Sequence, residues 1–295
     1  MTKEKVLESL CGLLEAYYDR DSAGKSEVIA LFRESADAAA YRALESGIRN
    51  NEHDRMRNAA MEIAVALGSR SLTFLTGLLA DADEEVRTFA GVMLGTLKDA
   101  GATPALVKAL ADPDMNVKHA AAEALGKIGD GRAVGPLIDA LSADLWLQFP
   151  AVMALGDVGD ARAVGPLVAL LKMPGMNMPA IQALGKIGDP AALDPLAGLL
   201  DDEDPALREW VLEAAAAILS RWPESGCSLD LNARTRAMLV ETLRADSLEA
   251  RRNAAIMLGC CKVQESVPAL VALDADHDMK EVARKALWRI GQEPA

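Results

Sequence analysis

The chain has few aromatic residues and lacks any long apolar run. Its 295 residues include only 4 Phe, 3 Tyr and 4 Trp, whereas β-sandwiches and β-barrels are rich in aromatic and β-branched side chains. No stretch reaches the roughly 20 consecutive apolar residues that a transmembrane helix needs. By contrast, 54 Ala and 41 Leu dominate the sequence, and both residues favour helices. The composition therefore predicts an all-α protein that does not bind or span a membrane.

Positive charge and cysteine are also scarce. The 31 Lys and Arg against 44 Asp and Glu give a formal net charge of −13, which disfavours binding to nucleic acid or anionic lipid. The cysteines show no C-x-x-C spacing and no companion histidines, and they are Cys11, Cys227, Cys260 and Cys261. We therefore expect reduced thiols, no metal site and no cofactor. The first five residues lead directly into an amphipathic pattern without a signal-peptide core, which predicts a cytoplasmic location.

One phrase recurs through the middle of the chain. It reads ALGKIGD at residues 124–130, ALGDVGD at 154–160 and ALGKIGD at 183–189, with weaker copies at 93–95, 257–259 and 286–287. Its leucines at positions 94, 125, 155 and 184 are 31, 30 and 29 residues apart. A repeat of about 30 residues is too short for a domain and suits two helices with two turns. The chain is therefore predicted to consist of repeated helical hairpins.

Each repeat carries signals for the ends of its helices. An acidic turn such as Asp112–Asp114 precedes the second helix, where carboxylates can cap the helix and favour its positive end. Apolar residues then follow at i, i+4 and i+8, as in Val117, Ala121 and Leu125, and they form a buried stripe. The glycine after this stripe ends the helix.

These residues resemble the HEAT repeat, in the short bacterial form named after phycobilisome lyases. The resemblance covers about residues 38–291 and implies a right-handed α-α superhelix, a HEAT-repeat solenoid, with about eight hairpins and an N-terminal helical cap. We expect second helices at 54–67, 84–98, 116–128, 147–158, 177–187, 206–221, 248–261 and 279–290. The predicted organisation is a cap at 1–37, repeats 1–6 at 38–221, a loop insertion at 222–231, and repeats 7–8 with a C-terminal cap at 232–295, all in one continuous solenoid.

Charged residues recur near the start of the second helices. In the family that the chain resembles, such acids and bases form a ladder between adjacent hairpins. The base position is occupied by Arg57, Arg87, Lys118, Gln148, Asn177, Arg208, Arg251 and Lys280, and acids such as Asp83, Asp114, Asp144, Asp204 and Asp276 precede it. Repeats four and five carry Gln148 and Asn177 in place of a base, so we expect the ladder to be interrupted there.

The same two repeats replace the charged turn with apolar residues and proline. Residues 146–150 read WLQFP and residues 173–179 read MPGMNMP. One interpretation is that both helices start late, so that each proline lies in a tolerated first turn and Trp146 and Met176 fill the gap. The other is that the late start opens a groove lined by Trp, Phe and Met, which are frequent at recognition sites. The sequence leaves both open.

Two positions of each second helix should form rows along the inner, concave face. One is the residue directly after the base position, such as His119, Phe149 and Met178. The other is the residue one turn later, such as Glu123, Met153 and Gln182. These rows are polar at both ends and apolar in the middle. We therefore predict a partner-binding groove made of Trp146, Phe149, Met153, Met176, Met178, Gln182, His119 and Glu123.

The enzymes with related repeats do not fit the sequence. The resemblance to deoxyhypusine hydroxylase would require His-Glu pairs on several second helices, whereas this chain has only His53, His119 and His277. A DNA glycosylase of helical repeats needs a basic face, which a net charge of −13 does not provide. Phycobilin lyase subunits remain as a resemblance of the scaffold.

We therefore predict a non-catalytic protein-binding scaffold or adaptor. It would hold a protein or peptide segment of basic character with apolar anchors on its concave face. The alternative is a lyase or chaperone-like subunit that acts on a bilin-type or other small apolar ligand. The sequence gives no oligomeric state.

Overall fold

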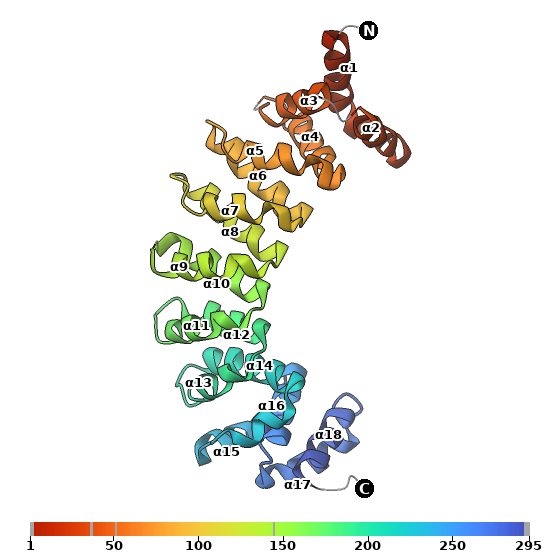
Figure 1. Ribbon diagram of the computed structural model, residues 1–295. Coiled ribbons are helices and arrows are strands. Elements are labelled where there is room, and N and C mark those ends of the chain that lie inside the picture. The colour runs from red at the N-terminus through yellow and green to blue at the C-terminus, as the bar shows by residue number, and fades with distance from the viewer. Residues whose placement is uncertain (1–2, 36–37, 51, 144, 292–295) are drawn as a thin grey trace. The chain divides into compact units, whose positions relative to one another are not determined.

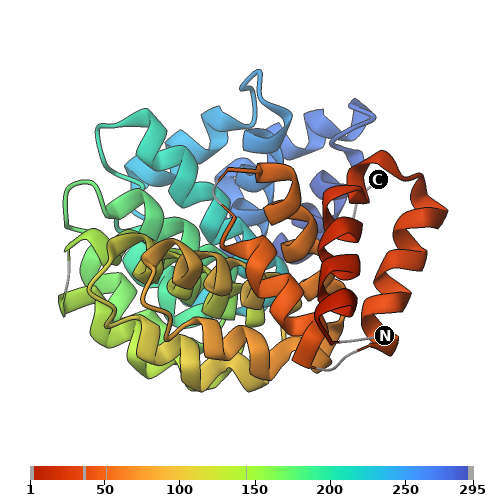
Figure 2. The ribbon, with the colours of Figure 1, turned by 90° about the horizontal axis from the view of Figure 1, so that it is seen from above.

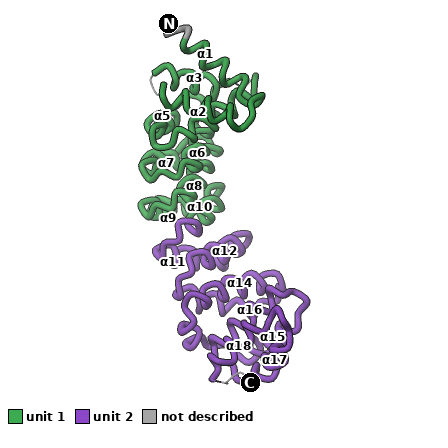
Figure 3. The backbone as a smooth tube through the Cα atoms, turned by 90° about the vertical axis from the view of Figure 1, so that its right-hand side faces the viewer, with its two compact units in different colours: residues 1–154 green, residues 155–295 purple. Residues whose placement is uncertain are grey.

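The structure is a computed structural model that describes residues 3–35, 38–50, 52–143 and 145–291. These residues form helices and connecting turns without any strand, and none of the helices is long and apolar enough to cross a membrane. The chain divides into two compact units, Met1–Ala154 and Leu155–Ala295 (Figure 3). The division falls within one helix.

Unit 1 consists of helical hairpins preceded by two further helices (Figure 1). Its α-helices are α1 (Lys3–Glu15), α2 (Ser22–Glu34), α3 (Ala38–Ile48), α4 (Asp54–Ala66), α5 (Leu72–Leu78), α6 (Glu84–Leu97), α7 (Thr103–Ala109), α8 (Met115–Ile128), α9 (Val134–Ala143) and α10 (Leu145–Val158), which runs past the division. Short 3-10 helices lie at Tyr17–Asp19, Gly68–Ser71, Ala100–Ala102 and Gly131–Ala133. Helix α1 packs on α3 and α4, and α2 packs on α4, at the N-terminal end (Figure 2).

Unit 2 continues the same hairpin pattern. Its α-helices are α11 (Val164–Leu170), α12 (Asn177–Ile187), α13 (Leu193–Ala197), α14 (Pro205–Arg221), α15 (Ala233–Thr242), α16 (Leu248–Cys260), α17 (Val267–Ala272) and α18 (Lys280–Ile290). Short 3-10 helices lie at Ala161–Ala163, Pro190–Ala192, Pro223–Ser228, Gln264–Ser266 and Leu273–Ala275. The second helices α12, α14, α16 and α18 pack on one another in order.

The predicted fold class is confirmed. The structure is all-α, its hairpins stack as in a HEAT-repeat superhelix, and the second helices begin and end within two residues of the predicted positions. The predicted loop at 222–231 contains the 3-10 helix Pro223–Ser228, which packs on α14 and α16. The predicted boundary of the N-terminal cap falls on residues 36–37, which lie outside the described residues.

The stacking depends on close contacts between glycine and alanine. A Cβ atom placed on Gly95 would lie 2.9 Å from the Cα of Ala124 in the next second helix. The corresponding distance is 3.0 Å from Gly185 to Ala214. These distances are shorter than an ordinary van der Waals contact, so only glycine lets the helix backbones approach this closely. The glycine of the recurring phrase therefore sets the spacing between repeats.

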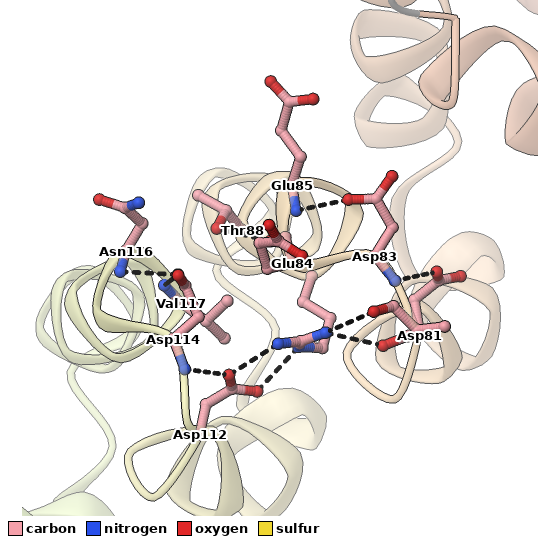
Figure 4. A network of polar contacts seen from close by, with 11 residues as sticks. Asp81, Asp83, Glu84, Glu85, Thr88, Asp112, Asp114, Asn116 and Val117 are labelled. Atoms are coloured by element: carbon pink, nitrogen blue, oxygen red, sulfur yellow. Dashed lines mark hydrogen bonds and ion pairs between the residues drawn. The ribbon is translucent and has the colours of Figure 1, made fainter.

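The predicted charge ladder is confirmed in part. The Nε and Nη2 atoms of Arg87 each donate to a carboxylate oxygen of Asp112 at 2.9 Å, and Nη1 donates to the carbonyl of Asp81 at 2.9 Å (Figure 4). Arg251 and Asp276 form the corresponding pair at 2.8 Å. Burial alone would raise the pKa of Asp112, but hydrogen bonds from Arg87 and from the Asp114 N–H hold it below its ordinary value.

Three of the predicted ladder acids have a different role. Asp83, Asp114 and Asp204 each accept a backbone N–H in the first turn of the second helix, so they are N-caps. The acid that pairs with the base lies two residues earlier, as Asp112 does relative to Asp114. The sequence prediction assigned both roles to one position because each turn contains two acids.

Candidate functional site

Helix α10 differs from its neighbour α8 on the exposed face. The residues of α8 that face solvent are polar, namely Asn116, His119, Glu123 and Lys127. The residues of α10 at the equivalent positions are Trp146, Phe149, Met153 and Asp157, so three of the four polar side chains are replaced by apolar ones. A helix that is apolar on its exposed face as well as on its buried face presents apolar side chains to solvent.

The apolar side chains of α10 form one stripe, which we call the α10 stripe: Leu145, Trp146, Phe149 and Met153. At about 100° per residue, these four positions fall within about 100° of the helix circumference. Leu145 is 74% exposed, Trp146 is 80% exposed and Phe149 is 52% exposed, while Met153 is half-buried. The chain thus presents two of its scarce aromatic side chains to solvent on a single helix.

The predicted late start of α10 is wrong. Helix α10 begins at Leu145, ten residues before its core leucine, as α8 does at Met115. Pro150 therefore lies inside the helix, where it cannot donate a hydrogen bond to the carbonyl of Trp146. Trp146 does not fill a gap either, because its side chain is exposed.

The prediction of a late start is correct for the next repeat. Helix α12 begins at Asn177, seven residues before Leu184, so Pro179 lies in its first turn. Met176 and Met178 are half-buried, and Gln182 is exposed on α12. These three predicted site residues belong to unit 2, whereas Trp146, Phe149, Met153, His119 and Glu123 belong to unit 1.

His119 and Glu123 lie on α8 with exposed side chains. The Glu123 carboxylate forms an ion pair with Lys127 Nζ at 2.7 Å. Across the described ranges, no group of three or more His, Cys, Asp or Glu side chains is arranged to hold a metal ion.

Gln148 retains half of the function of the ladder base. Its buried side chain donates from Nε2 to the carbonyl of Leu141 at 2.7 Å, just as Arg87 donates to the turn carbonyl of Asp81. Gln148 cannot form the charged bidentate pair that Arg87 makes with Asp112. The substitution therefore keeps the turn attached while it removes a charge from the middle of the chain.

A second candidate surface lies in unit 2, on α14 and its neighbours. Ala214 of α14 packs against Gly185 as Ala183 of α12 packs against Gly156, so the two alanines are equivalent positions. When α14 and α12 are aligned on these alanines, Glu209 and Glu213 are equivalent to Met178 and Gln182. The sequence analysis missed this pair, since α14 has Ala214–Ala216 where the other repeats have the ALG phrase. Counting from the N-cap Asp204 would have placed both residues.

Several cavities along this part of unit 2 share lining residues. One of them, of about 690 Å³, lies among α14, α15 and α16 and is lined by Arg208, Glu209, Leu212, Met238 and Arg244, among others. Two smaller cavities, of about 210 and 240 Å³, lie on either side of Trp210. We call these two cavities together with Trp210 the α14 groove.

The adjacent thiols of Cys260 and Cys261 in unit 2 are unsuited to nucleophilic chemistry. Burial, followed by repulsion from Cys260 and Cys227, raises the pKa of Cys261 to about 12. Burial likewise raises the pKa of Cys260, although Arg289 opposes this effect. Thiols that remain protonated at neutral pH are poor nucleophiles and poor metal ligands.

The fold and these surfaces define the class of the molecule as an α-helical repeat protein. A sequence model of HEAT repeats matches residues 72–148 and 136–217, and the chain is a HEAT-repeat protein. No curated protein matches the sequence.

Solved structures that are similar to this chain include an engineered protein and two proteins of known name. An engineered protein is 22% identical, with 98% of this chain and 89% of that chain covered and a TM-score of 0.59. The complex of CpcE and CpcF of phycocyanin lyase from Nostoc sp. PCC7120 is 21% identical, with 75% and 93% covered and a TM-score of 0.46. Human deoxyhypusine hydroxylase is 19% identical, with 89% and 98% covered and a TM-score of 0.38. At 22% identity, the likeness to the engineered protein concerns the fold alone.

Proposed function

We propose that the chain is a non-catalytic scaffold that binds a protein or peptide segment on the exposed face of its second helices. The observation that carries the proposal is the α10 stripe, where apolar side chains replace the polar ones of α8. Exposed aromatic side chains on a rigid helix are typical anchors of protein interfaces. Within unit 2, Met178 and Gln182 on α12 are proposed as further binding residues, separate from the α10 stripe.

The charge and chemistry of the molecule support a binding role over catalysis. The net charge of −13 favours a partner with basic character. The α10 stripe offers no titratable group, and catalysis would require convergent acids, bases or nucleophiles. Its neighbours His119 and Glu123 are exposed on α8, and Glu123 is paired with Lys127.

The proposal is tested by affinity capture from the source cell with the wild type and three variants of the full chain. Trp146→Ala and Phe149→Ala should each reduce the captured partner about tenfold or more, because truncating an interface hot spot costs about 2 kcal/mol or more. Trp288→Ala is the matched control, since Trp288 is 72% exposed on α18. Circular dichroism establishes that each variant keeps its helicity.

The outcome is decided by comparison of the three variants. Equal capture by the wild type and the two α10 variants would refute the proposal. A change in the visible spectrum of a linear tetrapyrrole on mixing with the protein, abolished by Phe149→Ala, would instead favour the small-ligand alternative.

A further inference from the structure

The α14 groove lies within unit 2, where α12, α14 and α16 stand side by side (Figures 1 and 3). Trp210 and Glu213 line both of its cavities. The cavity of about 210 Å³ is bounded by Glu209, Leu212, Glu249, Ala250 and Asn253. The cavity of about 240 Å³ is bounded by Gln182, Gly185, Lys186, Ala214 and Ala217.

The indole of Trp210 is a partly exposed apolar surface that lines both cavities. Trp210 is 36% exposed, so part of its indole faces the two cavities. Small residues surround it, with Ala250 in one cavity and Ala214 and Ala217 in the other. Because these side chains are short, a long and narrow side chain of a partner can lie beside the indole.

The cavity toward α16 is negatively charged. Glu209, Glu213 and Glu249 line it, and no basic side chain does. Within the described ranges, none of these three carboxylates forms an ion pair, whereas Lys186 in the other cavity pairs with Asp157 at 2.6 Å. Burial, followed by repulsion from Glu249 and Glu209, raises the pKa of Glu213. These three carboxylates are therefore available to a basic group of a partner.

A guanidinium group fits these features better than other side chains do. It is planar, stacks on the face of an indole, and donates two parallel hydrogen bonds to a carboxylate. The methylene groups of arginine also pack on apolar surface while the charged end reaches polar groups. A lysine ammonium would pair with the carboxylates but would gain less binding energy from stacking on the indole.

We propose that the α14 groove is a recognition site for an arginine side chain in a peptide segment of the partner. The segment lies across α14, its guanidinium stacks on Trp210 in the cavity toward α16, and Glu213 and Glu249 accept its hydrogen bonds. The proposal rests on the scaffold function above and specifies the chemistry of a contact that is separate from the α10 stripe.

The test uses a fluorescein-labelled octapeptide of alternating Gly and Arg, with Gly-Lys and Gly-Glu peptides of the same length. Fluorescence anisotropy with the full chain at physiological salt should show the Gly-Arg peptide binding more tightly than the Gly-Lys peptide, and no binding of the Gly-Glu peptide. Trp210→Ala and Glu213→Gln should each weaken the Gly-Arg complex about tenfold. Trp210→Phe, which retains an aromatic face, should lose less affinity for the Gly-Arg peptide than Trp210→Ala.

Two control variants separate recognition from general charge attraction. Trp288→Ala removes an exposed tryptophan outside the groove, and Glu85→Gln removes one exposed carboxylate from α6. Both should change binding less than twofold. Equal losses in control and groove variants, or no loss in the groove variants, would overturn the proposal.

The outcome is independent of the test of the α10 stripe. If the Gly-Arg peptide does not bind while partner capture still depends on Phe149, only the arginine site is wrong. If the peptide binds through Trp210 while capture is insensitive to Phe149, the α10 stripe is wrong and the arginine site stands. Should Trp210→Ala fail to fold, Glu213→Gln decides the question, because it changes a carboxylate to an amide of nearly the same size.

Discussion

The contact between Gly259 and Ala286 predicts a destabilising effect from the smallest possible side chain. A Cβ atom on Gly259 would lie 2.6 Å from the Cα, 2.8 Å from the Cβ and 3.3 Å from the carbonyl oxygen of Ala286. Ordinary contacts begin at 3.4 Å, so in Gly259→Ala helices α16 and α18 must separate by about 0.8 Å. The closest atom belongs to the backbone, and no rotation of a side chain can relieve the overlap.

The size of the effect follows from two opposed terms. Overpacking of a tight interface costs about 1–3 kcal/mol, whereas replacing glycine by alanine within a helix contributes about 0.5–1 kcal/mol of stability. We therefore expect Gly259→Ala to lower the free energy of unfolding by about 1–2 kcal/mol. Gly77→Ala on α5 is the matched control, because its added Cβ would meet no atom within 4 Å. That variant should gain about 0.5–1 kcal/mol.

The assay combines urea unfolding, followed by far-ultraviolet circular dichroism, with hydrogen exchange of peptides from α16 and α18. Repeats couple mainly to their neighbours, so the loss should appear as faster exchange in these two helices, while α6 and α8 keep the exchange rates of the wild type. The double variant Gly259→Ala with Ala286→Gly should recover only part of the loss, since the Cα atom remains. If Gly259→Ala were as stable as Gly77→Ala, the spacing argument would be refuted.

Three further predictions concern charges and thiols. Arg87→Gln should lower the free energy of unfolding by about 1–3 kcal/mol, since it leaves Asp112 buried without its partner. In urea unfolding, the double variant with Asp112→Asn should lose less stability than the two single variants lose together. Hydrogen bonds from the side chain and the backbone N–H of Arg162 lower the pKa of Asp160 from 3.8 to about 2. Its stabilisation is therefore complete above pH 3.8 and lost as the pH falls toward 2. Asp160→Asn should accordingly cost about 1 kcal/mol at pH 7 and progressively less below pH 4 in urea titrations; an unchanged difference at pH 3 would contradict the assignment. Because its pKa is about 12, Cys261 should react with an aromatic disulfide at pH 8 about a thousandfold more slowly than a free thiol. Mass spectrometry of labelled peptides measures this rate. Rapid labelling of Cys261 in the native state would contradict the prediction.

Much of the fold could be predicted because each repeat carries its own boundary signals. The turn acids, the buried stripe and the final glycine placed the second helices within two residues of their observed ends. These signals are local, and they act through capping and the left-handed conformation of residues such as Gly129 and Gly188.

The errors arose where a local rule competed with packing. Proline normally marks the first turn of a helix, which is correct for Pro179 but wrong for Pro150. Helix α10 extends beyond Pro150 toward its N-terminus, and Gln148 on this added turn holds the carbonyl of Leu141 from a buried position. A sequence pattern cannot weigh such a tertiary hydrogen bond against the helix bond that proline removes.

The candidate site was harder to predict than the fold. The exposure of Trp146 and Phe149 follows from the alignment of α10 with α8, and the sequence analysis selected both residues. Glu209, Trp210 and Glu213 escaped because the phrase used for alignment is missing from α14. Their arrangement around two cavities depends on α12 and α16, which only the structure brings together.

The contact of glycine with alanine also bears on how such a chain can grow. In Ala183-Leu184-Gly185, the alanine receives Gly156 from the preceding repeat and the glycine approaches Ala214 in the following one. This three-residue phrase thus carries both complementary halves of the same interface. A duplicated or deleted repeat of about 30 residues would bring matching surfaces together at the new junction without any compensating substitution. Changes in repeat number are therefore available to this architecture in a single genetic step.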